Sequence, residues 1–179
     1  SPSRGLGDVY KRQLIGSALV AGAAAALNQL SERDIDDTME RTRHRPIPSG
    51  RVQPWEACIL AAFLTGLGLT ELAIGANTLA SGVALVTLVR YIAIYTPLKR
   101  RTSWSTLIGA VPGALPPVIG WAAARGTLGV EALVLFGIVF LWQLPHFLAI
   151  GWYCREDYRN AGFRMLSYRD IAGQRTSFQ

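Results

Sequence analysis

Long apolar runs constrain this chain more than any other feature of its sequence. Five segments are mostly apolar, at residues 14–27, 55–76, 78–98, 104–124 and 128–153. All but the first reach the ~20 residues that a helix needs to cross the hydrocarbon core of a bilayer. The first run is shorter, so it either spans with help from its flanks or has lost residues at its start. The runs predict an all-α membrane protein with about five transmembrane helices.

The composition agrees with a membrane protein. Half of the 179 residues are hydrophobic and 17% are charged, and the mean hydropathy is +0.25. A soluble domain of this size carries more charge and interrupts its apolar runs more often. The alternative is a very apolar soluble core, because a helix that is apolar all round suits a buried bundle as well as lipid. We expect the lipid bilayer to surround the chain.

The first residues, SPSRGLGDVYKRQ, differ in composition from the rest of the chain. They have no apolar core, so we expect neither a cleavable signal peptide nor a span there. We interpret residues 1–13 as a leader or non-native segment and residues 14–179 as a partial membrane domain. Cys58 and Cys154 have no partner spacing, which favours small apolar side chains over a disulfide or a metal site.

Basic residues are distributed unequally among the connections between the runs. They are frequent in residues 32–54, in the Lys-Arg-Arg of residues 99–101, and after residue 154, but sparse near residue 77 and in residues 125–131. Two spans separate each basic connection from the next, so all of them lie on one membrane face, which the positive-inside rule places in the cytoplasm. This topology explains most of the net charge of +6 and gives no reason to expect nucleic acid as a partner.

Acidic residues follow the first apolar run directly. On a helix, Asn28, Glu32 and Asp36 lie on one face because they are spaced four residues apart, whereas Asp34 and Asp37 point elsewhere. One amide and two carboxylates suit a hard cation such as Mg²⁺, which takes carboxylates together with phosphate oxygens of a substrate. Carboxylates this close repel one another unless a cation compensates.

Basic side chains on the same face suit a phosphate-bearing substrate, through charge-assisted hydrogen bonds. The candidates in two connections are Arg41, Arg43, Arg45, Lys99, Arg100 and Arg101. The alternative is a solvated loop whose arginines only set the topology. A second acidic group, Glu156 and Asp157, follows the last run beside Arg155 and Arg159. Two acidic groups at span ends, with basic residues between them, predict a site for two divalent ions that bridge a diphosphate.

Three long motifs resemble a known family. They are NQLSERD with ERTRHRPIPSGRV, then YTPLKRRTSWSTLIGAVPGALPPVIGW, then FLWQLPHFLAIGWYCREDYRNAGFRML. Over residues 14–176 they resemble the haem-farnesylating branch of the UbiA-type intramembrane prenyltransferases. Asn28, Glu32 and Asp36 fall on the family's Asn-x-x-x-Asp-x-x-x-Asp signature, with Glu in place of the middle Asp. Residues 155–158 resemble that branch's form of the second acidic motif.

The resemblance implies a UbiA-type bundle of nine transmembrane helices around a central cavity. This chain matches about five of them, so we expect it to be truncated at both ends and inactive by itself. The implied reaction transfers a farnesyl group from farnesyl diphosphate to a vinyl group of protohaem IX and supplies haem for cytochrome oxidase biogenesis. Mg²⁺ is the implied cofactor, haem a synthase a partner, and the location a bacterial inner membrane with the active-site loops cytoplasmic.

The resemblance also implies roles for individual residues. Mg²⁺ is held by Asn28, Glu32 and Asp36 on one side of the diphosphate and by Glu156 and Asp157 on the other. Charge that develops on the departing diphosphate is neutralised by basic groups. The residues assigned to that task or to ligand binding are Lys99, Arg100, Arg43, Arg45, Arg101 and Tyr158. The product carries a hydroxyethylfarnesyl group, and the sequence does not show which residue handles the water.

His146 is the one histidine within an apolar run. Histidines in spans usually face a cavity or a partner, and Pro145 loosens the helix beside it. The candidate roles are ligation of haem iron or a hydrogen bond to a propionate; the alternative is a histidine satisfied by a neighbouring helix. The VPGALPP run of residues 111–117 breaks the fourth span, and it either shapes a cavity wall or only kinks the helix.

Other functions stay open at the level of sequence. Within the same fold, the acceptor could be a quinone precursor or a chlorophyllide, although the spacing of all three motifs favours haem. A cation transporter or channel would place charged residues along the spans, whereas here nearly all cluster at one face. No feature of the sequence supports a scaffold for oxidase assembly.

Overall fold

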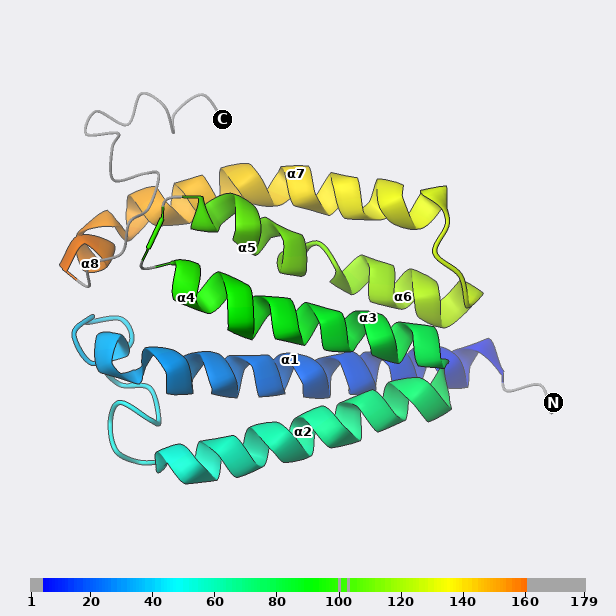
Figure 1. Ribbon diagram of the computed structural model, residues 1–179, viewed down its shortest axis with the longest axis horizontal. Coiled ribbons are helices and arrows are strands. Elements are labelled where there is room, and N and C mark those ends of the chain that lie inside the picture. Colours follow the sequence, from blue (N-terminus) through cyan, green and yellow to red (C-terminus); the bar gives the residue numbers. More distant parts are fainter. Residues whose placement is uncertain (1–4, 100, 103, 161–179) are drawn as a thin grey trace.

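The computed structural model describes residues 5–99, 101–102 and 104–160 (Figure 1). Within these ranges the chain forms helices joined by turns, without a strand. Five helical segments of this part are long and apolar enough to cross a membrane. The predicted all-α bundle with about five spans is therefore confirmed for the described residues.

The first two spans form an antiparallel pair. They are α1 (Leu6–Asp36) and α2 (Pro54–Gly75). The third span consists of α3 (Thr78–Val89), a π-helical segment η1 (Arg90–Tyr95) and the short α4 (Thr96–Leu98). Figure 1 shows α1 lying between α2 and the third span, so that α1 is covered on both sides.

The fourth span is interrupted, as the VPGALPP run predicted. It consists of α5 (Ser105–Gly113) and α6 (Pro116–Arg125). The fifth span is α7 (Val130–Tyr153), and the short α8 (Arg155–Asn160) comes after it. Proline lacks an N–H, so the carbonyl four residues before each proline loses its helical donor. The helix accordingly stops at Gly113 and restarts at Pro116.

The start of the first helix differs from the sequence prediction. We expected a boundary after residue 13, but α1 begins at Leu6 and continues through it. On α2, Glu71 Oε2 accepts a hydrogen bond from Arg12 Nη1 at 3.3 Å, and the Arg12 side chain lies over Gly75. Hydropathy missed this part of the helix because it is polar, yet Arg12 packs on α2. The origin of residues 1–13 stays a prediction.

Polar contacts fix the helix ends that lie near the N-terminus of α1. Asn77 caps the start of α3, where its side chain accepts a hydrogen bond from the Ala80 amide at 2.9 Å. The same side chain donates to the carbonyl of Ala122 at 2.7 Å and so ties the third span to the end of α6. Gly126 then ends α6 with φ of +69°, a left-handed conformation that glycine adopts without strain.

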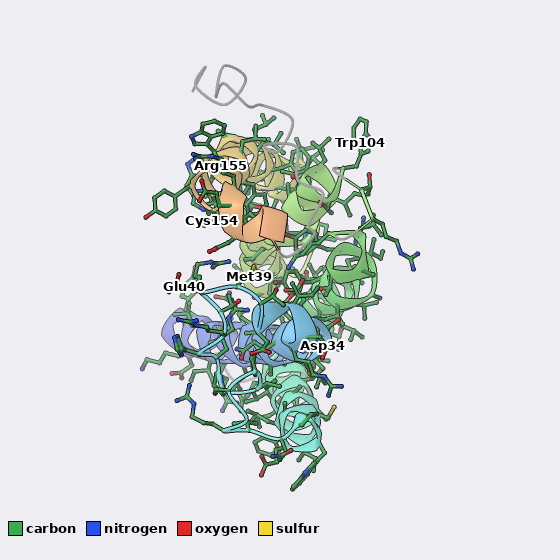
Figure 2. All side chains as sticks on the ribbon, turned by 90° about the vertical axis from the view of Figure 1, so that its left-hand side faces the viewer. Asp34, Met39, Glu40, Trp104, Cys154 and Arg155 are labelled. Carbon is green, nitrogen blue, oxygen red and sulfur yellow. The ribbon has the colours of Figure 1, made fainter. Side chains whose placement is uncertain are left out.

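The basic connections lie together at the other end of the bundle. The end of α1, residues 37–53, α4 and α8 all lie at the left of Figure 1, opposite the N-terminus. Figure 2 looks onto this end and shows Met39 near its middle and Trp104 at its edge. The prediction that these connections share one face of the bundle is confirmed. We call it the charged end.

Close packing of small residues joins α1 to α2. A side chain added at Gly68 would place its Cβ 2.9 Å from the carbonyl oxygen of Gly16 and equally close to Val20. Spans cannot associate by the hydrophobic effect in lipid, because lipid tails are as apolar as the side chains. Small residues therefore stabilise the pair by letting the two backbones approach.

Gly68→Ala should destabilise the bundle by about 1–3 kcal/mol, because its methyl group meets backbone that cannot move aside. Gly66→Ala is the matched control on the same helix, since nothing lies within 4 Å of its added Cβ. It should be neutral or stabilise by up to about 1 kcal/mol through helix propensity. Unfolding in detergent, followed by circular dichroism, measures both. Equal effects at the two positions would contradict close packing at Gly68.

Candidate functional site

A polar pocket of about 170 Å³ opens at the charged end. Its walls come from four parts of the chain: α1, the loop after it, the third span and α8. The lining residues are Asn28, Glu32, Asp36, Met39, Arg41, Arg45, Tyr91, Tyr95, Lys99 and Tyr158. Segments that are distant in sequence therefore converge on one small volume, which concentrates charge of both signs.

The face that α1 turns into this pocket is the predicted one. Asn28, Glu32 and Asp36 are 8%, 6% and 1% exposed, whereas Asp34 and Asp37 are exposed. Asn28 Nδ2 donates a hydrogen bond to Glu32 Oε2 at 3.0 Å, which orients the carboxylate. Two buried carboxylates on one helix are costly unless each meets a cation.

Lys99 supplies the cation for Glu32. Its ammonium donates to Glu32 Oε1 at 3.0 Å and to Asn28 Oδ1 at 3.3 Å, and it lies 4.7 Å from the centre of the Tyr95 ring. The side chains of Lys99 and Glu32 are only 12% and 8% exposed. This buried ion pair joins α1 to the end of the third span. The sequence assigned Lys99 to a diphosphate, and its contact with Glu32 was not foreseen.

Arg45 supplies the cation for Asp36. Its guanidinium donates to Asp36 Oδ2 at 2.7 Å from the loop after α1. The buried hydroxyl of Thr42 donates to the backbone carbonyl of Asp36 at 2.9 Å. The loop thus folds back over the end of its own helix. Beneath this loop, Met39 packs with Ile35 and Tyr158.

The π-helical segment η1 carries two of the residues of the third span that line the pocket. A π-helical turn holds one residue more than an α-helical one, which rotates the next residues by about 100° around the axis. Tyr91, Tyr95 and Lys99, all spaced four residues apart, line the pocket from this span. Sequence reasoning missed both tyrosines. The spacing that identified Asn28, Glu32 and Asp36 would have found them, but nothing in RYIAIY signals a π-helical turn.

An apolar cavity of about 670 Å³ adjoins the polar pocket. Tyr91 and Tyr95 line both, so the two spaces meet at these rings. The cavity continues between α1, α3 and the α5–α6 break, where Pro112, Gly113 and Pro116 form its wall. The expectation that the VPGALPP run shapes a cavity wall is confirmed.

Tyr158 is the part of α8 that reaches the pocket. It packs on Met39, and the Arg41 guanidinium lies 6.0 Å from the centre of its ring. Burial raises the pKa of the Tyr158 phenol above its ordinary value of 10.0, although Arg41 opposes the shift. The phenol is therefore protonated at neutral pH and able to donate a hydrogen bond to an anion.

The second acidic group does not line the pocket. Glu156 is exposed, 4.0 Å from Arg155, and Asp157 is half-buried. Successive helical residues differ by about 100° in direction, so α8 directs Tyr158 inward and its neighbours elsewhere. The predicted convergence of both acidic groups on one diphosphate is not seen in this arrangement.

Other predicted residues also lie away from the pocket. Arg43 pairs with Glu40 at 3.3 Å, and Arg101 is exposed. His146 is exposed on α7, where its ring stacks on Trp142 with centres 5.0 Å apart, and it lines neither space. His146 thus faces neither of these two spaces, and its roles as a haem ligand or a propionate donor stay predictions. Arg100 falls outside the described residues.

The chemistry of the pocket fits the predicted ion. Among the described residues, no three His, Cys, Asp or Glu side chains group as a ready metal site. Asn28, Glu32 and Asp36 offer oxygen atoms only, which suits Mg²⁺ when phosphate oxygens and water complete its shell. Such an ion would displace Lys99 and Arg45 from the carboxylates and free them for the phosphate.

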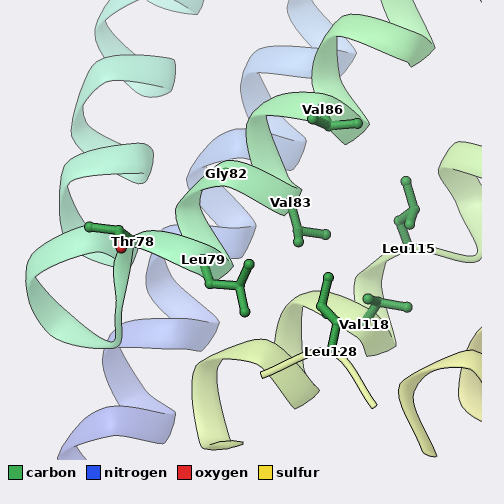
Figure 3. A pocket seen from close by; sticks show the side chains of 8 residues that line it. All are labelled: Thr78, Leu79, Gly82, Val83, Val86, Leu115, Val118 and Leu128. Atoms are coloured by element: carbon green, nitrogen blue, oxygen red, sulfur yellow. The ribbon is translucent and has the colours of Figure 1, made fainter. Parts of the chain in front are cut away.

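A third space differs in its lining from both the polar pocket and the apolar cavity. It is an open groove of about 580 Å³ between α3 and the α5–α6 region, near the end opposite the charged one (Figure 3). Its lining is apolar except for Thr78. Its lining residues include no ionisable group, and their composition suits contact with lipid.

The sequence of the chain is similar to those of known proteins. A sequence model described as the UbiA prenyltransferase family matches residues 11–179. The protoheme IX farnesyltransferase of Solibacter usitatus is 51% identical over 88% of this chain and 54% of its own length. The enzyme of that name from Anaeromyxobacter sp. strain Fw109-5 is 48% identical over 92% of this chain and 55% of its own length. The one from Myxococcus xanthus is 49% identical over 83% of this chain and 51% of its own length.

The chain thus spans about half the length of the curated relatives it matches. No solved structure matches it.

Removing Lys99 alone should be more harmful than removing the whole ion pair. Lys99→Met leaves Glu32 buried without its cation, which should cost about 3–5 kcal/mol of stability. Lys99→Met with Glu32→Gln should recover most of that loss. Arg33→Met, in an exposed pair with Asp34, is the control and should change stability by less than about 1 kcal/mol. Unfolding without divalent ions measures all three. If the double variant is as unstable as Lys99→Met, the buried pair does not govern stability here.

Proposed function

The chain belongs to the UbiA prenyltransferase family, and we propose that it is part of an enzyme that farnesylates protohaem IX. The reaction would transfer the farnesyl group of farnesyl diphosphate to a vinyl group of the haem and yield haem o. The observation on which this rests most is the polar pocket that opens past two tyrosines into an apolar cavity. An allylic diphosphate has the same division into a charged head and an apolar tail.

The head would bind at the polar pocket. Asn28, Glu32 and Asp36 would hold Mg²⁺, which supplies positive charge to the diphosphate as it departs. Lys99 and Arg45 now neutralise the carboxylates, and each would turn to a phosphate oxygen when the ion arrives. Both contribute to catalysis because the negative charge of the leaving group grows in the transition state.

Further groups would complete the cradle around the phosphates. Arg41 and Tyr158 already line the pocket, one as a cation and the other as a neutral hydrogen-bond donor. Glu156 and Asp157 would need α8 to turn before they reached a second ion. Arg43, Arg100 and Arg101 stay proposals as phosphate contacts.

The tail would lie in the apolar cavity. Its volume of about 670 Å³ falls within the range of about 300–1,000 Å³ that is usual for small-molecule sites. The wall consists mostly of apolar side chains such as alanine, leucine and proline, which would keep bulk water away from the allylic cation. Tyr91 and Tyr95 would lie where the head joins the tail, beside the bond that breaks.

The acceptor and the cellular setting are inferred from the relatives. Several that are 43–51% identical are named for protoheme IX, which favours haem over a quinone precursor or a chlorophyllide. His146 and Trp142 form an aromatic surface on α7, where His146 could ligate iron or bond a propionate. We place the protein in a bacterial inner membrane with the charged end cytoplasmic, and haem a synthase as the consumer of the product. We expect the chain by itself to be inactive.

Asp36→Asn should lower farnesyl transfer by about a hundredfold or more, because it removes a charge that holds the ion and orients Arg45. The exposed Asp34→Asn, on the same helix end, is the control and should retain activity within about twofold. Both are tested in a chimera in which this chain replaces the matching segment of the Solibacter usitatus relative. Haem o is quantified by liquid chromatography, with Mg²⁺ and with a chelator. Full activity of Asp36→Asn, or activity unaffected by the chelator, would contradict the assigned site.

A further inference from the structure

Gln143 is a buried polar residue that has no role in the proposed binding of the diphosphate or of the farnesyl tail. It lies within α7, in an otherwise apolar stretch, and is 8% exposed. Its Oε1 has no hydrogen-bond partner among the described residues. An amide oxygen in a membrane interior costs free energy until it accepts a hydrogen bond. The position therefore lacks a donor.

The surroundings of Gln143 add a second acceptor. Its amide lies against Gly113, where any added Cβ would collide with it. The carbonyl of Gly113 has no helical donor, because Pro117 stands four residues further on and has no N–H. A water molecule has two O–H donors and could serve both oxygens. A buried amide beside a broken helix is a site of the kind that ordered water occupies in membrane proteins.

This position borders the apolar cavity. Gly109, Pro112 and Gly113 line the cavity on the α5 side, and Phe147, one turn beyond Gln143, lines it from α7. The Tyr95 ring lies over Gly109, one helical turn nearer the charged end. A water molecule held between Gln143 and Gly113 would thus lie about one turn deeper than the junction of the two spaces.

We propose that Gln143 and the α5–α6 break hold the water molecule that becomes the hydroxyl group of the product. The inference rests on the proposed function. When the bond between the farnesyl C1 and the diphosphate oxygen breaks, the electron pair leaves with the diphosphate. C1 then bonds to the terminal carbon of the vinyl group, which leaves a positive charge on the internal carbon, next to the porphyrin ring.

Two outcomes are open to that cation. It can lose a proton from a neighbouring carbon and become an alkene, or bond to a water oxygen and become an alcohol. In the second case the water loses a proton, which the diphosphate accepts. Gln143 is a positioning residue, because an amide oxygen orients water by accepting its hydrogen bond but is too weak a base to take the proton. Its presence selects the alcohol.

The ratio of alcohol to alkene tests this role in the chimera described above. Gln143→Leu should raise the share of alkene relative to alcohol by about tenfold, the effect of losing one buried hydrogen bond. Gln143→Glu keeps an oxygen acceptor and should restore the alcohol. Gly113→Ala keeps Gln143 but displaces its amide, so it should shift the ratio in the same direction as Gln143→Leu. If Gln143→Leu does not fold, Gly113→Ala tests the role of Gln143 in its place. Mass spectrometry separates the products, which differ by one water molecule.

Thr65→Val is the matched control for Gln143→Leu. Like Gln143, Thr65 is a polar residue within a span, but its hydroxyl already donates to the Ala61 carbonyl at 2.7 Å. It should leave the ratio unchanged. If Gln143→Leu lowers turnover while the ratio stays that of the unmodified chimera, Gln143 is only structural; the inference is overturned and the proposed function stands. If the unmodified chimera makes no prenylated porphyrin, the proposed function fails and the inference with it.

Discussion

The ion pair between Lys99 and Glu32 is the contact on which the charged end of this bundle depends. It is buried, it joins the first span to the third, and it places a lysine 3.0 Å from a carboxylate that has little contact with water. A buried carboxylate is unstable alone, so α1 keeps its acidic face inward only because Lys99 and Arg45 meet it there. The same pairing neutralises both carboxylates, and Arg41 remains as the excess positive charge among the residues that line the pocket. In the proposed function, a metal ion with a diphosphate would enter this pocket by exchanging ion-pair partners.

The chemistry of this pocket depends on where it opens. Two tyrosines separate it from an apolar cavity, and a broken helix forms the far wall of that cavity. The third span contains a π-helical segment, and prolines interrupt the fourth span. In each case a regular helical turn is replaced, which changes the direction of the side chains or backbone groups that line a site. Gln143 extends this pattern into the apolar part, where a single amide could control which product forms.

The sequence predicted the parts that depend on local patterns. Apolar runs gave the spans, four-residue spacing placed Asn28, Glu32 and Asp36 on one face, and the VPGALPP prolines marked the break. Contacts between distant segments were not predictable in this way. The pairing of Lys99 with Glu32, the rotation of Tyr95 into the pocket and the outward direction of Glu156 all depend on how helices dock. Polar residues at the start of α1 were missed because hydropathy does not register contacts such as that of Arg12 with Glu71.

In the proposed function, the diphosphate head and the farnesyl tail bind in two joined spaces within this chain. Photolabelling tests it most directly, using farnesyl diphosphate with a photoreactive group at the end of its tail, bound to the chain in nanodiscs with Mg²⁺. We predict adducts on the cavity wall, at residues such as Val20 and Ile119, which unlabelled farnesyl diphosphate suppresses. Adducts confined to the outer groove of Figure 3, at Leu79 or Val83, or labelling that farnesyl diphosphate does not suppress, would contradict the claim.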